Sequence, residues 1–295
     1  MVVRAHTVAF EGVEARPVEV QCALSPGLPA FSIVGLPDKA VSEARDRVRA
    51  AMGALGLALP SKRITINLSP ADLPKEGSHF DLPIALSVLA ALAVIPADLV
   101  EQTVALGELS LDGTLVPVIG ALPAAIAAAS ADRNLLCPSE CGAEAAWVTA
   151  TSVIAAKSLH GVLRHFTGDQ PLAPAQPGEV AAVGAERDMS DVRGQERAKR
   201  ALEIAAAGRH HVLMVGAPGS GKSMLAARLP SILPSLAPSE SIETTQIYSA
   251  LGRLAPGQPL MARQYGSPEC GPSPRGPAPW PAPRCGRGRE PFRWP

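Results

Sequence analysis

Short runs of apolar residues recur through the N-terminal part of the chain, separated by turns that contain Gly or Pro. Their length and their alternation with polar residues predict β-strands rather than helices. The predicted strands are Val2–Phe10, Val18–Leu24, Phe31–Val34 and Arg63–Leu68. Between the third and the fourth, apolar side chains at helical spacing predict an amphipathic helix over Ala40–Leu57.

The following segments continue this mixture of helices and strands. Leu82–Val94 is apolar on nearly all sides, which predicts a helix buried in a protein core and too short to span a membrane. The remaining predicted elements are strands over Val104–Leu109 and Leu115–Val118, a helix over Leu122–Ala131, short strands near Leu135 and Val153, and two helices that end at Phe166. The pattern predicts one α/β domain over residues 1–166.

Changes in composition mark the ends of this domain and of the next. Residues 167–188 are rich in Pro, Gly, Ala and Gln, which is typical of a linker. A second domain is expected over residues 189–261. Residues 262–295 then hold nine of the 30 prolines, interleaved with Gly and Arg and without apolar periodicity. Such a segment buries too little surface to offset its ordering entropy, so we expect a disordered tail.

One motif in the second domain carries most of the chemical information. Gly216–Ser223 reads Gly-Ala-Pro-Gly-Ser-Gly-Lys-Ser and matches the phosphate-binding P-loop, G-x-x-x-x-G-K-[ST]. The apolar run His211–Val215 predicts a buried parallel strand before it, and Met224–Leu229 predicts a helix that ends at Pro230. Strand, turn and helix in this order direct backbone N–H groups and a helix N-terminus at a phosphate chain.

The P-loop residues have expected roles in holding ATP and Mg²⁺, which we predict as cofactors. Gly216, Gly219 and Gly221 allow left-handed and closely approaching backbone conformations. Lys222 places its charge between the β- and γ-phosphates, and the Ser223 hydroxyl is the expected Mg²⁺ ligand. The predicted nucleotide contacts of the motif are Gly216, Ala217, Pro218, Gly219, Ser220, Gly221, Lys222, Ser223 and Met224.

Composition argues against several other classes of protein. Apolar residues make up 47% of the chain and the formal net charge is zero, so no overall field draws it to nucleic acid. Arg4, His6 and Glu11 interrupt any signal-peptide core, and no apolar window reaches the length of a membrane span, so we expect a cytoplasmic protein without a membrane partner. Cys137 and Cys141 are four residues apart, which fits no common zinc spacing.

Four further stretches resemble a known family: Phe31–Asp38, Ile66–Gly77, Phe80–Ala85 and Gly107–Gly113. With them, the chain up to about Met261 is similar to the magnesium chelatase-like AAA+ ATPases of the YifB/ComM type. The resemblance implies a domain with the Lon-protease-like fold (ribosomal S5 domain 2-like), joined to a P-loop AAA+ domain that is incomplete here. It also implies hexameric rings and, in the competence-associated members, ATP-driven branch migration of DNA.

The resemblance extends to the segment before the P-loop. Asp191–Gln195 lies one helix, Glu196–Ala207, ahead of the P-loop strand, and this placement is similar to the segment that contacts adenine in AAA+ ATPases. The implied contacts are Val192, Gly194 and Gln195.

A proteolytic function is not expected from the Lon-like domain. In Lon the nucleophilic serine follows a Lys-Asp-Gly-Pro stretch; here Lys75–Ser78 stands in its place, and the nucleophile position falls on His79. Pro123 follows the turn after which the activating lysine would stand. A serine without a positioned base is a weak nucleophile, so we expect a structural or substrate-engaging domain.

Hydrolysis of ATP needs groups that we do not find after the P-loop. The carboxylates beyond Ser223 are Glu240, Glu243, Glu269 and Glu290, and none follows an apolar strand or forms an Asp-Glu pair. No arginine is placed as a finger. We therefore name no catalytic residue and expect weak or no turnover. The Pro-, Arg-, Gly- and Ala-rich tail leads to the hypothesis that a frameshift near codon 262 replaced the rest of the ATPase domain.

Two alternatives stay open. A genuine tail would bind nucleic acid or an aromatic-lined groove, with Trp280, Phe292 and Trp294 standing among arginines. In the second alternative, the chain is a non-enzymatic interaction protein in which only the N-terminal domain folds.

Overall fold

The computed structural model describes residues 2–178, 187–234 and 236–252. Of these, residues 2–178 and 236–252 form one unit and residues 187–234 form a second. Each unit has a hydrophobic core of its own. The predicted tail over 262–295 and the hypothesis of a frameshift near codon 262 lie outside the described residues.

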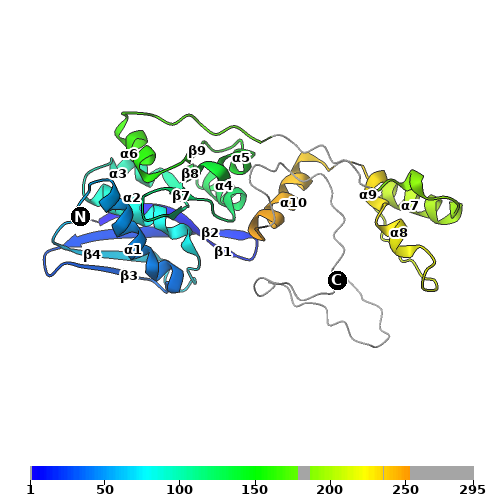
Figure 1. Ribbon diagram of the computed structural model, residues 1–295, viewed down its shortest axis with the longest axis horizontal. Coiled ribbons are helices and arrows are strands. Elements are labelled where there is room, and N and C mark those ends of the chain that lie inside the picture. The colour runs from blue at the N-terminus through cyan, green and yellow to red at the C-terminus, as the bar shows by residue number, and fades with distance from the viewer. Residues whose placement is uncertain (1, 179–186, 235, 253–295) are drawn as a thin grey trace. The chain divides into compact units, whose positions relative to one another are not determined.

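The first unit is built on a seven-stranded mixed sheet with the order β3-β4-β2-β1-β5-β8-β9 (Figure 1). Its strands are β1 (Val2–Glu11), β2 (Glu14–Ser25), β3 (Ala30–Val34), β4 (Arg63–Ser69), β5 (Thr103–Ala105), β8 (Asn134–Pro138) and β9 (Val153–Ala156). β2 runs antiparallel to β1 and β4, and the other neighbouring pairs are parallel. A separate two-stranded ladder joins β6 (Glu108–Leu109) to β7 (Leu115–Val116).

The helices of the first unit connect these strands. They are α1 (Lys39–Ala54), η1 (Ser78–Phe80), α2 (Asp81–Ala91), α3 (Ala97–Glu101), α4 (Ala121–Ser130), η2 (Ser139–Cys141), α5 (Gly142–Ala145), α6 (Leu159–Thr167) and α10 (Pro238–Ala250). The predicted α/β class is confirmed. No helix within the described ranges is long and apolar enough to cross a membrane.

The core of the first unit follows the periodicity of the sequence. In β4, Ile64, Ile66 and Leu68 are buried while the residues between them are half-buried, as expected for a strand with one face on the core. The predicted core helix is confirmed as α2, in which every residue from Asp81 to Ala90 is buried. It packs against β1, β2 and α1.

One predicted strand is divided in two. Val104–Leu109 was expected to be continuous, but β5 ends at Ala105 and β6 starts at Glu108. Between them, the backbone N–H of Gly107 donates to His79 O at 3.0 Å, and the N–H of Leu82 donates to Gly107 O at 3.0 Å. Because these bonds tie Gly107 to the start of α2, the chain leaves the main sheet at this point.

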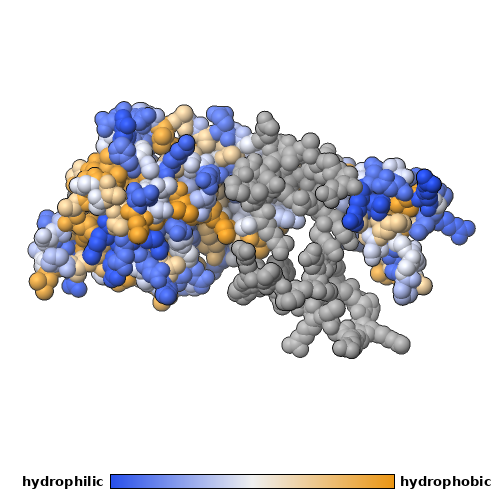
Figure 2. Space-filling view, in the orientation of Figure 1, coloured by the Kyte–Doolittle hydropathy of each residue, from blue (hydrophilic) through white to orange (hydrophobic). Residues whose placement is uncertain are grey.

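The second unit contains η3 (Met189–Asp191), α7 (Glu196–Gly208), α8 (Lys222–Ala226) and α9 (Leu229–Ile232). Its core consists of Met189, Val192, Leu202 and Leu225. Figure 2 shows hydrophilic residues gathered over α7, whose charged side chains stand away from this core. The predicted helix after the P-loop forms as α8, and Pro230 lies in the first turn of α9, where its missing N–H is tolerated.

The prediction of a strand over His211–Val215 is wrong. The segment forms no strand or helix, and the side chains of Leu213 and Val215 are each 87% exposed. A strand is stable only where a neighbour takes up its backbone N–H and C=O groups. No residue of the range 187–234 forms a strand that could pair with it.

Helix α10 belongs to the first unit, although its sequence falls within the range 189–261 predicted for the second domain. It packs against α4, and Gln246 Nε2 donates to Val13 O at 3.1 Å. The side chains of Thr245 and Ser249 are buried in this contact. The domain limits proposed from the sequence stay a prediction.

Candidate functional site

The P-loop forms a tight turn in the second unit. Gly219 and Gly221 have φ values of 79° and 85°, in the left-handed region that favours glycine. At Gly216 an added Cβ would lie 2.9 Å from Ser220 Oγ, which is closer than a real Cβ contact. All three predicted glycines therefore occupy positions where a side chain is disfavoured, and the loop closes on itself through the bond from Ser220 N to Ala217 O at 3.2 Å.

The lysine of the motif folds back over its own loop. Lys222 Nζ donates to Gly216 O and Ala217 O, each at 2.8 Å, and to Ser220 Oγ at 3.2 Å. No carboxylate within the described part of the chain forms a salt bridge with it. Ser223 and Met224 follow at the start of α8 with exposed side chains. The ammonium group is thus held by neutral oxygen atoms of its own loop.

The segment expected to contact adenine meets the P-loop through one residue. Gln195 Nε2 donates to Ser220 O at 3.5 Å, and a Cβ on Gly221 would lie 2.8 Å from the same Gln195 nitrogen. Gly194, with φ 70°, makes the turn that places Gln195 there. Val192 is only 3% exposed and packs in the core of the unit. Of the three predicted residues, Gln195 lies beside the loop and Val192 and Gly194 hold the segment in place.

Sequence reasoning missed Arg228. Its Nε donates to Asp188 O at 3.1 Å, its Nη1 donates to Met224 O at 3.2 Å, and its Nη2 lies 3.8 Å from the Asp191 carboxylate. This side chain connects α8 to η3, the helical turn before the Gln195 segment. The only local signal was the spacing of four residues between Met224 and Arg228, which is common on helices and not specific.

In the first unit, the residues at the Lon-like nucleophile position have structural partners. Ser78 Oγ donates to the Glu108 carboxylate, and Lys75 is buried with its Nζ donating to Pro70 O. His79 is buried, with Nε2 at 2.9 Å from Val8 O, and burial lowers its pKa. Ser78, His79 and Glu108 line an open groove of about 670 Å³. The serine therefore contacts a carboxylate, and within the described residues it forms no hydrogen bond with a lysine or an imidazole that could take its proton.

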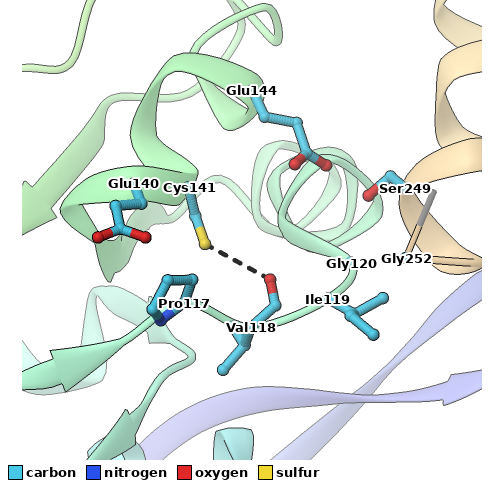
Figure 3. A pocket seen from close by; sticks show the side chains of 9 residues that line it. All are labelled: Pro117, Val118, Ile119, Gly120, Glu140, Cys141, Glu144, Ser249 and Gly252. Carbon is cyan, nitrogen blue, oxygen red and sulfur yellow. Dashed lines mark hydrogen bonds between the residues drawn. The ribbon is translucent and has the colours of Figure 1, made fainter. Parts of the chain in front are cut away.

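A smaller cavity, of about 160 Å³, lies where α10 meets the start of α4 (Figure 3). Glu144 Oε1 accepts the N–H of Leu122 at 3.2 Å, and Cys141 Sγ donates to Val118 O at 3.4 Å. In Figure 3 the carboxylate of Glu144 and the hydroxyl of Ser249 face each other. Burial raises the pKa of Glu144, while the N–H of Leu122 lowers it. Nothing in the local sequence pattern pointed to this group.

Comparison with known proteins finds two matches to family models. Residues 18–141 match the model described as subunit ChlI of Mg-chelatase, and residues 188–276 match the model described as magnesium chelatase, subunit ChlI. The second match extends past residue 261, where the resemblance found by inspection of the sequence ends.

Individual relatives agree with these matches. The chain is 42% identical over 263 residues to the uncharacterized protein YifB of Salmonella typhimurium, covering 89% of this chain and 52% of that protein. It is 44% identical over 249 residues to the competence protein ComM of Haemophilus influenzae, covering 83% and 49%. A shorter match, 40% identical over 63 residues, covers 21% of this chain and 10% of an archaeal Lon protease from Archaeoglobus fulgidus. The chain spans about half the length of the curated relatives that it matches over most of its length.

Proposed function

The chain belongs to the magnesium chelatase-like family of the YifB/ComM type, and on this premise we propose that its second unit binds the phosphates of ATP. The observation that carries the proposal is the state of Lys222. Its ammonium group lies within the loop, held by two carbonyls and a hydroxyl. A phosphate oxygen that replaces these neutral acceptors would add the attraction between opposite charges to the hydrogen bond of the ammonium group.

The residues present fit a nucleotide with Mg²⁺. Gly219 and Gly221 provide the left-handed turns that let backbone N–H groups approach phosphate oxygens, and Gln195 closes one side of the loop. Ser223 offers an exposed hydroxyl at the start of α8. Mg²⁺ keeps several waters and is held by few protein oxygens together with substrate phosphates, and this hydroxyl would be one of those protein oxygens. When bound, the ion neutralises charge on the phosphate oxygens.

The carboxylates of the second unit have other partners. Asp188 and Asp191 cap η3, Glu196 pairs with Lys199 at 3.4 Å, and Glu203 pairs with Arg200 at 2.9 Å. An ATPase needs a carboxylate that holds the metal and orients water. The proposal for residues 187–234 is therefore nucleotide binding, with turnover left to groups outside this range.

Assembly into a ring and action on DNA are activities that we propose for the longer proteins of the family. The family suggests an ATP-driven ring of six subunits that acts on DNA in the cytoplasm, and its support here is the similarity to a competence protein. Because the chain spans about half of that relative, assembly and action on DNA are proposals for the longer proteins.

A titration of the full chain with a fluorescent ATP analogue, with and without Mg²⁺, tests the binding. Lys222→Ala should weaken binding by about tenfold or more, because a charge-assisted contact is lost. Lys199→Ala is the matched control, since Lys199 lies on α7 and pairs with Glu196. Equal affinities for the Lys222 variant and the native chain would refute the proposal.

The rival function is that of an interaction protein whose first unit alone folds stably. The small core of the second unit and the exposed segment His211–Val215 favour it. Limited proteolysis with and without ATP separates the two functions. Protection of residues 187–234 by ATP supports nucleotide binding. Digestion of this range at the same rate with ATP, leaving a fragment that contains residues 2–178, supports the rival.

A further inference from the structure

The two edges of the main sheet differ in how the chain covers them. At the β9 edge, the segment after α6 lies alongside the strand: Ala175 N donates to Val153 O at 2.7 Å, and Pro174 forms a bridge with Ile154. At the opposite edge, β3 pairs with β4 alone. No other segment of the described chain forms backbone hydrogen bonds with Ala30–Val34, which Figure 1 shows as the outermost strand.

The β3 edge lacks the features that usually protect an open strand. Edge strands commonly carry charged residues, Pro or a bulge that prevents another chain from pairing with them. β3 reads Ala-Phe-Ser-Ile-Val, with neither charge nor Pro, and pairs with β4 in continuous register. Large apolar side chains are exposed on the strand and beyond its ends: Val34 is 46% exposed, and Leu28 and Leu36, two residues outside the strand, are 88% and 61% exposed. Alternate residues of an edge strand direct their N–H and C=O groups away from the sheet. This edge therefore presents both backbone donors and acceptors and exposed apolar side chains to a further strand.

A groove of about 520 Å³ lies beside the first half of β3, between this strand, the end of α1 and the loop over residues 57–62. Its apolar lining includes Phe31, Leu57 and Leu59. The charged residues that line it are Arg49 and Lys62, and no Asp or Glu is among the lining residues. Arg63, which is exposed, stands opposite Ala30 in the register of β3 and β4 and adds a third positive charge at this end of the strand.

We propose that the β3 edge is a docking site for an extended acidic peptide, which adds to the sheet as a further strand. The backbone of the peptide pairs with the outward groups of Ala30–Val34, an apolar side chain enters the groove, and a carboxylate lies against Arg49 and Lys62. The positive lining without a carboxylate selects an acidic partner. A single-stranded nucleic acid fits less well, because the one aromatic ring in the lining, Phe31, is 7% exposed and offers no stacking face.

The test uses the full chain and a fluorescein-labelled short peptide of alternating valine and glutamate. We expect saturable binding that weakens as salt is added. Arg49→Glu and Lys62→Glu should each weaken it by about threefold to tenfold, as expected for reversing one exposed charge. Lys157→Glu is the matched control: it follows β9 at the covered edge, is exposed, and should leave the affinity unchanged. A valine and lysine peptide of equal length should not bind.

Hydrogen exchange then distinguishes strand addition from a simple charge contact. Bound peptide should slow the exchange of backbone amides within Ala30–Val34 and leave those of β1 unchanged. Three outcomes would overturn the proposal. The first is the absence of saturable binding below about 1 mM peptide. The second is an oligothymidine that binds more tightly than the peptide and displaces it. The third is protection of β3 that increases with protein concentration in the absence of peptide, which would identify a second copy of the chain as the occupant.

Discussion

The ion pair between Arg47 and Asp81 offers the sharpest test of how the first unit is held together. Arg47 Nε lies 2.6 Å from Asp81 Oδ2, and Arg47 Nη2 lies 3.0 Å from Asp81 Oδ1. The Asp81 side chain is fully buried at the start of α2, and its Oδ2 also accepts the N–H of Leu109 at 3.1 Å. Arg47 reaches from α1 and also donates to Ala40 O at 2.9 Å. One buried carboxylate thus connects two helices and the β6 ladder.

We predict that Arg47→Met destabilises the protein by about 3–5 kcal/mol at neutral pH. The substitution keeps an apolar stem but removes the bond to Ala40 O and two charge-assisted hydrogen bonds to Asp81, each worth about 1.5–3 kcal/mol. It also leaves a buried carboxylate without its cation. Arg47→Met/Asp81→Asn should recover part of the loss, because it removes both charges and keeps an acceptor for Leu109 N.

The loss of stability caused by Arg47→Met depends on pH through the protonation of Asp81. Burial already raises the pKa of Asp81, against the lowering by Arg47 and by the N–H of Leu109. Without Arg47 the pKa of Asp81 rises further. Because the folded-state pKa then lies above the unfolded value, the penalty is largest at neutral pH and disappears as the pH falls below about 4. The loss caused by Arg47→Met should therefore shrink in acid.

The assay is urea denaturation of the full chain, followed by far-UV circular dichroism at neutral and acidic pH. The matched control is Arg45→Met, which removes an exposed arginine of the same helix that pairs with Asp46, and it should change the stability little. A loss below about 1 kcal/mol for Arg47→Met, or a loss equal at both pH values, would refute the assignment of a buried, cation-dependent carboxylate.

Two further predictions concern Glu144 and Gly35. Burial raises the pKa of Glu144, so its charged form opposes folding above that pKa, and Glu144→Gln should raise the melting temperature more at neutral than at acidic pH. An equal shift at both pH values would contradict it. Gly35→Ala should destabilise the protein strongly, because at a φ of 107° the new Cβ would lie 2.2 Å from Leu68 O. Gly27→Ala is the control for backbone strain alone, since Gly27 has a φ of 141° and a Cβ there would have no atom within 4 Å. Equal losses would show that the close contact relaxes.

Local periodicity predicted those parts of the fold that depend on a single buried face. β4 and α2 follow from the spacing of their apolar residues, since each needs only a core on the side that its pattern marks. The division at Gly107 did not follow, because it depends on bonds to His79 and Leu82, far away in sequence. The Arg47–Asp81 pair joins residues 34 positions apart and has no local signal either.

In the candidate site, too, the sequence identified some residues and not those that depend on distant contacts. The motif identified Gly216–Ser223, and the family resemblance named Gln195 as a nucleotide contact. In the structure Gln195 Nε2 donates to Ser220 O of the loop, and its contact with a nucleotide stays a prediction. The role of Arg228 could not be predicted, because it depends on where η3 lies. The exposure of His211–Val215 was missed, since an apolar run predicts a strand only where partner strands exist.

The turn of the P-loop depends on local contacts, whereas a strand before it would depend on contacts with other strands. The turn at Gly219 and Gly221 and the folding of Lys222 over Gly216 involve residues at most six positions apart, so the loop forms from its own sequence. The strand before it needs neighbours, which no residue of 187–234 supplies. Within this unit Gln195 donates to the loop at Ser220 O, and Arg228 connects the helix after the loop to η3 through its bonds to Met224 O and Asp188 O. A loop without a paired strand before it keeps the turn for phosphate but is less rigid, so we expect part of the binding free energy to be used to order the loop and the affinity to be lower.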